Sequence, residues 1–176
     1  MAPNSPESPT IIDPTVFNGA TPVKVASGFF QQCAVLNDGR VSCWGLLGSN
    51  GAMGDSVTTD ERIAPLIVRI NNANGVLEDL NDVVHIDSGY LETCAVKSNQ
   101  SIFCFGSDGS GGAAASVNTH YDGLSLETKV RLVSVSDVNT CVVSESNEVR
   151  CFGANPSTHT PLHPVSAIDA AWGGHV

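Results

Sequence analysis

One spacing of ten residues between cysteines recurs in this chain and constrains its fold more than any other feature. It occurs in three pairs: Cys33 and Cys43, Cys94 and Cys104, and Cys141 and Cys151. Each second cysteine is followed by an aromatic residue and a glycine, and each first cysteine by small or β-branched apolar residues. A spacing that recurs with the same neighbours marks an internal repeat, which decides how the rest of the chain is interpreted.

Each copy of the spacing encloses a predicted β-hairpin. In the first copy, two strand-like runs flank a short turn that ends at Gly39. A three-residue hairpin loop needs a left-handed residue at its end, and glycine adopts that conformation without steric cost. This loop places Leu36 opposite Arg40, and therefore Cys33 opposite Cys43. Facing residues of this kind have Cβ atoms about 4.5–5.5 Å apart, which is within reach of a disulfide.

The repeat extends beyond the hairpins. The second and third turns end at Gln100 and Asn147, and the left-handed region suits asparagine better than glutamine. Alternating apolar residues predict a strand before each hairpin, over 23–28, 84–89 and 132–136. After the first hairpin, residues 63–68 predict an outer strand, in which Pro65 marks an edge. About four short strands per unit is the content of one propeller blade.

The repeat resembles that of the regulator of chromosome condensation family. The resemblance is carried by Val-x-Val-Ala-Ser-Gly, Cys-Ala-Val-Leu-Asn-Asp-Gly-Arg-Val-x-Cys-Trp-Gly and Gly-x-Met-Gly in the first copy. It covers residues 21–176 and weakens in the later copies, which lack the Gly-x-x-Gly turn. The family forms β-propellers, usually of seven blades. The paired cysteines are similar to those of secreted bacterial relatives.

We therefore predict an all-β fold of propeller repeats, with about three four-stranded blades and the start of a fourth. The expected segments are a Pro/Ser-rich linker with an outer strand (1–20), blade one with a polar surface insertion at 71–82 (21–82), blade two (83–129), blade three (130–168) and the start of blade four (169–176). Closed propellers have about four to eight blades. We expect either a fragment of a longer protein or a chain that completes its sheets through copies of itself or a partner.

The six cysteines predict three disulfides, Cys33–Cys43, Cys94–Cys104 and Cys141–Cys151. Disulfides persist in oxidising compartments, so we expect an extracellular or cell-surface location, with the periplasm as a variant of it. The alternative is three pairs of reduced thiols in a cytosolic propeller. We expect no metal site, because paired strand cysteines without further ligands do not form a tetrahedral zinc set.

The charge of the chain restricts its partners. Eighteen acidic residues outnumber eight basic ones, giving a formal net charge of −10. Nucleic acid and anionic membranes both require a basic face, so neither is an expected partner. The apolar runs are too short to span a membrane, and the N-terminus has no signal-peptide pattern.

The remaining motifs carry little chemistry. Residues 109–114 match a dinucleotide fingerprint superficially, but no βαβ unit surrounds them, so we expect a blade turn. His159 and His163 are four residues apart, but the prolines beside them prevent a ligand-bearing helix, so we expect loop histidines. Asn99 begins a glycosylation sequon at a hairpin tip. Three aromatic residues at one repeat position are expected to pack between blades: Trp44, Phe105 and Phe152.

The sequence favours a function without catalysis. It contains neither a Gly-x-Ser-x-Gly elbow nor a Gly-Lys-Ser/Thr phosphate loop, and we expect no cofactor. We predict a non-enzymatic binding or assembly module that presents propeller loops or open strand edges to a protein partner or to further copies of itself. The resemblance also implies an alternative, a guanine-nucleotide exchange regulator of a small GTPase. A hydrolase that uses loop carboxylates and histidines is the third reading, without a motif to support it.

Overall fold

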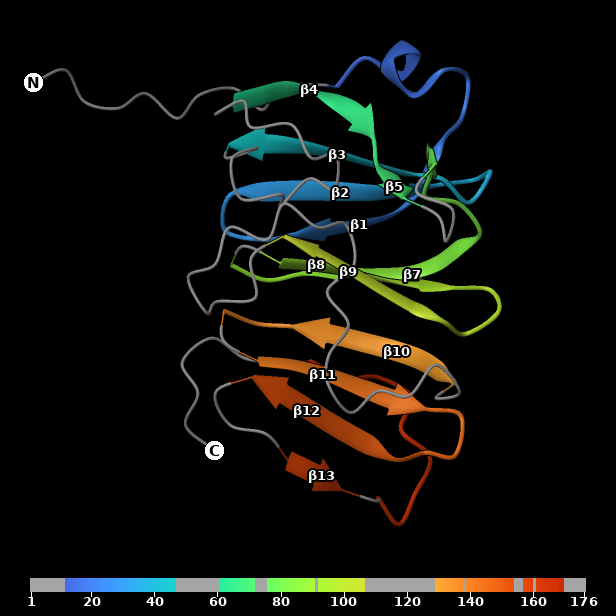
Figure 1. Cartoon of the computed structure of the whole chain (residues 1–176), viewed down its shortest axis with the longest axis vertical. Helices are drawn as coiled ribbons and strands as arrows, with labels where there is room; N and C mark the ends of the chain where they lie inside the picture. Colours follow the sequence, from blue (N-terminus) through green and yellow to red (C-terminus); the bar gives the residue numbers. More distant parts are fainter. Residues whose placement is uncertain are drawn as a thin grey trace, which may run out of the picture.

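A computed structural model of the chain describes residues 12–46, 61–71, 76–90, 92–106, 129–137, 139–153, 157–159 and 161–169. Its described strands form four antiparallel sheets, and the three larger ones follow one another along the longest axis (Figure 1). Each sheet is a simple meander in which strands that follow in sequence are hydrogen-bonded neighbours. The predicted all-β propeller architecture is confirmed for these residues. We call the three larger sheets the first, second and third blade.

The number of described strands differs between the blades. The first contains β1 (Pro22–Ser27), β2 (Gln31–Leu36), β3 (Val41–Leu46) and β4 (Glu61–Ile67). The second contains β7 (Val83–Ser88), β8 (Glu92–Lys97) and β9 (Ile102–Gly106). The third contains β10 (Val130–Val135), β11 (Asn139–Ser144), β12 (Val149–Gly153) and β13 (Ser157–His159). A fourth strand of the second blade would fall between residues 107 and 128, outside the described residues.

The hairpin turns have the predicted geometry. The N–H of Leu36 donates to the carbonyl of Arg40 at 2.8 Å, and Gly39 is left-handed with φ +83°. Gln100 and Asn147 take the same place in the later turns, each with φ +68°. The next blade helps to hold the unfavourable Gln100, because the N–H of Val130 donates to its carbonyl at 2.9 Å.

The outer strand of the first blade is also where the sequence predicts it. β4 stands at the end of the sheet and pairs with β3. The register shifts between Cys43, which faces Leu66, and Gly45, which faces Arg62. Pro65 lies inside this irregularity, at an edge where a residue without an N–H breaks no ladder bond.

The prediction of an outer strand within residues 1–20, over residues 11–17, is wrong. Residues Pro14–Phe17 form a 3₁₀ helix, η1, because local capping outweighs the apolar pattern. The side chain of Asp13 accepts the N–H of Thr15 at 2.9 Å, and a proline at the first helical position has its φ already set. The helix buries Phe17, which is 3% exposed, and η1 packs against β4.

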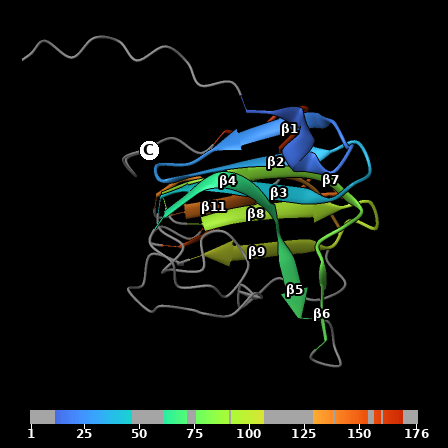
Figure 2. The same cartoon turned by 90° about the horizontal axis from the view of Figure 1, so that it is seen from above.

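The predicted surface insertion at residues 71–82 also takes part in strand pairing, which the sequence did not indicate. Part of it forms a small sheet in which β5 (Arg69–Asn71) pairs with β6 (Leu77–Asp79), and Figure 2 shows this hairpin projecting from the blades. Its base is anchored in the core by Val68 and Leu80, both 0% exposed. The N–H of Leu80 donates to the carbonyl of Val68 at 2.9 Å. The two apolar residues that flank the polar stretch therefore fix its position.

The hydrophobic core is divided between the two seams where blades meet. One cluster joins the first blade to the second, and the other joins the second to the third. Both seams follow the same plan, because each hairpin contributes its cysteines and valines to the face that meets the next blade. Among the described residues, no helix is long and apolar enough to cross a membrane.

Candidate functional site

All six cysteines form disulfides, in the three pairs that the sequence predicts. The S–S distances are 2.10 Å for Cys33–Cys43, 2.09 Å for Cys94–Cys104 and 2.07 Å for Cys141–Cys151. Each bond joins directly opposed strand residues. The first two pairs are at most 1% exposed, because each lies within the hydrophobic cluster of a seam. The third pair is half-buried.

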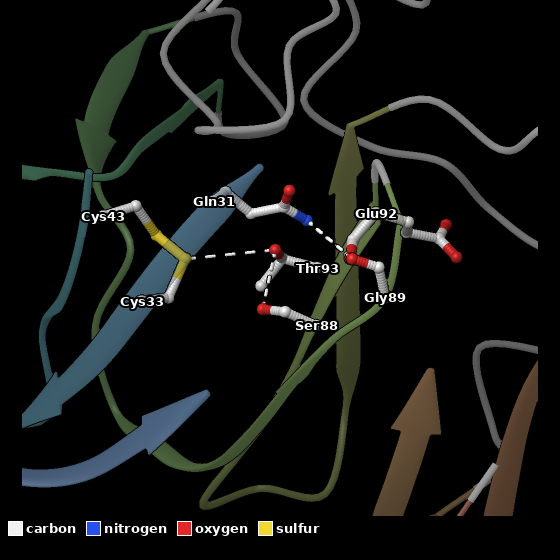
Figure 3. Close-up of a disulfide and its surroundings, with 7 residues drawn as sticks. All are labelled: Gln31, Cys33, Cys43, Ser88, Gly89, Glu92 and Thr93. Atoms are coloured by element: carbon white, nitrogen blue, oxygen red, sulfur yellow. Dashed lines mark hydrogen bonds between the residues drawn. A yellow bond between two sulfur atoms is a disulfide. The ribbon is translucent and has the colours of Figure 1, made fainter. Parts of the chain in front are cut away.

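A polar network crosses the first seam beside its disulfide (Figure 3). Gln31, which is 0% exposed, reaches from β2 into the second blade. Its Nε2 donates to the carbonyls of Gly89 at 3.3 Å and Glu92 at 3.2 Å. The hydroxyl of Thr93 lies 3.0 Å from that of Ser88 and 3.9 Å from Cys33 Sγ. These contacts fix the relative position of two blades.

Carboxylates have the same role in the second seam. The hydroxyl of Thr140 donates to Glu92 Oε2 at 2.8 Å, and Figure 3 shows the carboxylate of Glu92 pointing away from Gln31. Asp87 Oδ2 accepts the hydroxyl of Ser134 at 3.0 Å and the N–H of Val135 at 2.7 Å. Buried polar groups that are hydrogen-bonded in this way specify how two elements pack.

Glu92, Cys94 and Cys104 are residue types that can bind a metal ion, and they lie close together, but the two cysteines are not free thiolates. A carboxylate oxygen of Glu92 and the sulfurs of Cys94 and Cys104 lie within 4.8 Å of one another. The two sulfurs are bonded to each other, and the thiolate is the form of cysteine that binds metals. In this oxidised state, the three residues do not fit a metal ion.

Two backbone contacts bring the blades unusually close at one end of the seams. The N–H of Phe29 donates to the carbonyl of Gly89 at 3.1 Å, and the N–H of Tyr90 donates to that of Ser136 at 3.4 Å. A Cβ added to Gly28 would lie 2.2 Å from the Gly89 carbonyl oxygen. The recurring Ser-Gly of the repeat is therefore explained by this close approach of two backbones.

At this end of the blades, three aromatic rings form a cluster that we call the aromatic patch: Phe29, Phe30 and Tyr90. The ring centroids lie 4.5 Å, 5.1 Å and 5.4 Å apart. Phe29 is 63% exposed and Tyr90 37% exposed. The rings stand on the turns that follow β1 and β7, so two blades contribute to one surface. The sequence analysis missed this patch, although aromatic residues follow Ser-Gly in both copies.

The aromatic residues expected to pack between blades behave differently from the patch. Phe105 is 1% exposed and belongs to the cluster of the first seam. Phe152 is half-buried and packs against the cluster of the second seam. Trp44 is half-buried in the first blade. At this repeat position, Phe105 and Phe152 therefore pack in the seams. The exposed rings of the aromatic patch belong to other positions of the repeat.

A groove of about 430 Å³ lies between the first two blades at their other end. It is lined by Val23, Lys24, Val35, Leu36, Asn37, Asp38, Gly39, Asp82, Val83, Val84 and Ser98. Asp38 is held by Arg40, with 2.7 Å between Oδ2 and Nη2. The hydrogen bond from Arg40 lowers the pKa of Asp38 below its usual range. A carboxylate stabilised in its charged form is a poor proton donor or acceptor near neutral pH.

The remaining predicted positions do not come together. His159 is exposed on strand β13 and not in a loop as we expected, because residues 157–159 pair with β12. His163 is also exposed, and its carbonyl accepts Nδ2 of Asn147 at 2.9 Å. Asn99 is exposed at its turn, and its Oδ1 accepts the hydroxyl of Ser101 at 2.6 Å. Residues 109–114 and 170–176, which include the glycine-rich stretch and most of the predicted fourth repeat, lie outside the described residues.

Comparison with solved structures places this arrangement among the propellers. Human WBSCR16 superimposes with a TM-score of 0.61 at 18% identity, over 80% of this chain and 38% of its own. Yeast RCC1 (Prp20), solved with Kap60, gives 0.56 at 17% identity, over 77% and 30%. The ectodomain of the Physcomitrella patens receptor kinase CR4 gives 0.50 at 20% identity, over 86% and 34%.

These likenesses establish an RCC1-like β-propeller fold. The chain spans between 30% and 38% of the length of the three proteins. No protein-family model and no curated protein matches the sequence.

Proposed function

We propose that this chain is a non-enzymatic protein-binding module of an exported or cell-surface protein. The aromatic patch is the observation that carries the proposal. Exposed aromatic residues are enriched among those that dominate protein–protein binding energy, and they act best as clusters. A patch shared by two blades binds through a surface that exists only when the propeller segment is folded.

The patch is preorganised, which favours binding. Its turns are closed by the N–H of Gly28 donating to the Gln31 carbonyl at 2.8 Å and the N–H of Gly89 donating to the Glu92 carbonyl at 2.9 Å. Phe29 is further tied to the next blade through its own N–H. Side chains that are already held in place lose less conformational entropy when a partner arrives.

The charge supports a protein as the partner. A net charge of −10 disfavours nucleic acid, whose phosphates require lysine and arginine. It also disfavours anionic lipid surfaces. The partner in this proposal is therefore a protein that offers an apolar pocket or ridge to the rings.

The disulfides support a location outside the reducing cytosol. Two of them are fully enclosed between blades, and such bonds form and persist in oxidising compartments. The likeness of the cysteine pairs to secreted bacterial relatives is part of the same proposal. The alternative is a cytosolic propeller with reduced thiols. The intact mass before and after reduction distinguishes this alternative from the disulfide-bonded protein.

The comparisons add support only at the level of the fold. Yeast RCC1 was solved bound to Kap60, so a protein of this fold binds a protein partner. Regulation of a small GTPase remains the alternative function, and a shared fold does not by itself carry an activity. Stimulation of nucleotide release from a panel of small GTPases would favour that alternative.

The experiment compares partner capture by three immobilised proteins. The wild-type chain, the double variant F29S/Y90S and the control L162S are exposed to extracellular and cytosolic fractions of the source cells, and captured proteins are quantified. Leu162 is 97% exposed and lies away from the patch in sequence, so its replacement tests for loss of any apolar surface residue. We expect extracellular proteins that wild type and L162S capture and F29S/Y90S does not. Equal capture by all three proteins would contradict the proposal.

A further inference from the structure

The second blade carries a carboxylate beside its cysteines where the other two blades carry an amide. Gln31, Glu92 and Asn139 occupy one repeat position, since each pairs with the glycine two residues after the second cysteine of its hairpin. Each also stands two residues before the first cysteine. Because alternate residues of a strand point to the same face of the sheet, Glu92 places a carboxylate on the face that carries the sulfurs.

The three groups of the second blade are close together and enclosed. One carboxylate oxygen of Glu92 and the sulfurs of Cys94 and Cys104 all lie within 4.8 Å of one another. Glu92 is 6% exposed, Cys94 0% and Cys104 1%. From the third blade, the hydroxyl of Thr140 donates to Glu92 Oε2 at 2.8 Å. Carboxylates that bind metals are held by neighbouring hydrogen-bond donors in the same way.

We propose that Cys94 and Cys104, when they are reduced, bind a zinc ion together with Glu92. Thiolate sulfur and carboxylate oxygen are both zinc ligands, and three protein ligands leave the fourth tetrahedral position to a water molecule. The sequence analysis expected no metal site because it identified no further ligand beside the paired cysteines. Glu92 is such a ligand, and only the packing of the seam shows how well it is enclosed.

The site requires reduced sulfur and no other chemical change. In an oxidised chain, two external thiols form a disulfide with each other, and the sulfurs of Cys94 and Cys104 separate and take up two electrons and two protons. Zinc then displaces the two thiol protons, which pass to water. In a chain that folds in a reducing compartment, the disulfide does not form and only the second step takes place.

The seam has room for the ion where the disulfide stands. Two reduced sulfurs are no longer bonded, so they move apart to non-bonded contact whether or not a metal is present. Two thiolates that bind one tetrahedral zinc ion at about 2.3 Å are about 3.8 Å apart, which is close to that contact. The ion therefore needs little more separation of the sulfurs than reduction itself produces.

Charge favours the ion in this seam and distinguishes it from the equivalent positions. Two thiolates and one carboxylate carry three negative charges, of which a divalent cation neutralises two, and buried charges are costly unless they are paired or bind a metal. Gln31 and Asn139 supply no charge beside the other cysteine pairs, which therefore serve as internal controls. This inference does not depend on the aromatic patch, and partner capture by the oxidised chain tests the proposed function separately.

The first test uses cobalt(II), which replaces zinc in thiolate sites and gives them a characteristic absorption. Wild type is kept reduced with a phosphine, which adds no thiol ligand, and is titrated with cobalt. We expect one cobalt ion per reduced chain, with the charge-transfer band of a cobalt–thiolate bond, and none per oxidised chain. Circular dichroism follows the fold. Absence of the band, or a reduced chain that stays unfolded with and without zinc, would overturn the inference.

Glu92→Gln tests the third ligand with little change of shape. It keeps an oxygen that accepts from Thr140 and removes the charge, so it should weaken cobalt binding by at least about 10-fold, the smallest effect expected even for a neighbour of a metal ligand. Glu145→Gln, at an exposed carboxylate, should bind as wild type does. Zinc should also raise the melting temperature of reduced wild type and E145Q more than that of reduced E92Q. Equal cobalt affinity of E92Q and wild type would exclude the site.

A further measurement needs no variant. Reduced wild type is alkylated with and without zinc, and the modified cysteines are identified from the masses of their peptides. We expect zinc to slow the alkylation of Cys94 and Cys104 more than that of the other four cysteines. Equal protection of all three pairs would show binding to thiols without selection by the carboxylate, and would overturn the inference.

Discussion

The carbonyl oxygen of Gly89 lies 2.2 Å from the point where a Cβ on Gly28 would stand. The two residues are 61 positions apart and meet because the first two blades bring their backbones together at the end of the seam. The N–H of Phe29 donates to the same oxygen at 3.1 Å. A short contact between glycines thus coincides with a hydrogen bond that joins the blades.

We predict that Gly28→Ala and Gly89→Ala each destabilise the protein by about 3 kcal/mol, the upper range for overpacking a closely packed site. The obstacle is backbone in both cases, because a Cβ on Gly89 would lie 1.9 Å from the Ser136 carbonyl oxygen. Urea unfolding followed by circular dichroism measures the change. Ser27→Ala, at an exposed neighbour, should change the free energy of unfolding by less than about 0.5 kcal/mol. Equal stability of the alanine variants and wild type would contradict the observed seam.

Removal of a disulfide should lower the free energy of unfolding more in a buried seam than in the third blade, where the cysteines are half-buried. Each bond closes a loop of equal length, for which loop closure contributes about 2–3 kcal/mol. C33A/C43A also opens space in a fully buried cluster, so its loss should exceed that of C141A/C151A by about 1 kcal/mol. Urea unfolding compares the two variants. Intact mass of the wild type, measured before and after reduction, should rise by two hydrogens for each of the three bonds, whereas no rise would mean that the thiols are reduced.

Gln100 and Asn147 have the same left-handed φ of +68°. Replacement by glycine should nevertheless change the stability of the protein in opposite directions at the two positions. Gln100→Gly should stabilise the second hairpin by about 0.5–1 kcal/mol, because glycine removes the strain of that conformation. Asn147→Gly should destabilise the third hairpin by about 1–2 kcal/mol. It removes side-chain bonds to Arg131 at 3.0 Å and to the N–H of Val165 at 2.8 Å. Thermal unfolding of the two variants is the measurement, and shifts of the same sign would refute this account.

The ion pair of Asp38 and Arg40 should make a small, pH-dependent contribution to stability. The Arg40 hydrogen bond lowers the pKa of Asp38 in the folded state, so the contribution is present above the unfolded pKa and is lost as the pH falls through the folded one. The Asp38 side chain is 41% exposed, which limits the effect to less than about 1 kcal/mol. Asp38→Asn should therefore be less stable than wild type at pH 7 and equally stable near pH 2. A difference that persists at low pH would assign the effect to the turn and not to the charge.

The buried carboxylate of Glu92 provides a test of the second seam. Thr140→Val removes the hydroxyl that donates to Glu92 Oε2 at 2.8 Å, and the loss of one partner of a buried polar group costs about 1–3 kcal/mol. Thr140→Ser keeps the hydroxyl and should recover most of this loss. Hydrogen exchange at β8 and β11 measures the local effect, which should be larger there than in the first blade. Equal protection in the two variants would exclude a role for the hydroxyl.

The sequence by itself determined the hairpins, their register and the pairing of the cysteines. These features depend on residues close together in the chain: alternation with period two, and a turn whose last residue accepts a left-handed conformation. Counting outward from Gly39 places Cys33 opposite Cys43 without knowledge of any other blade. The same local reasoning located the outer strand that contains Pro65.

Only the tertiary structure decided what each face of a blade meets. Val68 and Leu80 flank a polar stretch and give no sign in the sequence that they enter one core. Residues 11–17 have an apolar strand-like pattern, yet Asp13 caps a 3₁₀ turn there. The exposure of Phe29 and Val25, and the burial of Phe105 and Ile86, depend on which blade lies alongside. Those contacts join residues about 60 positions apart, and no local periodicity encodes them.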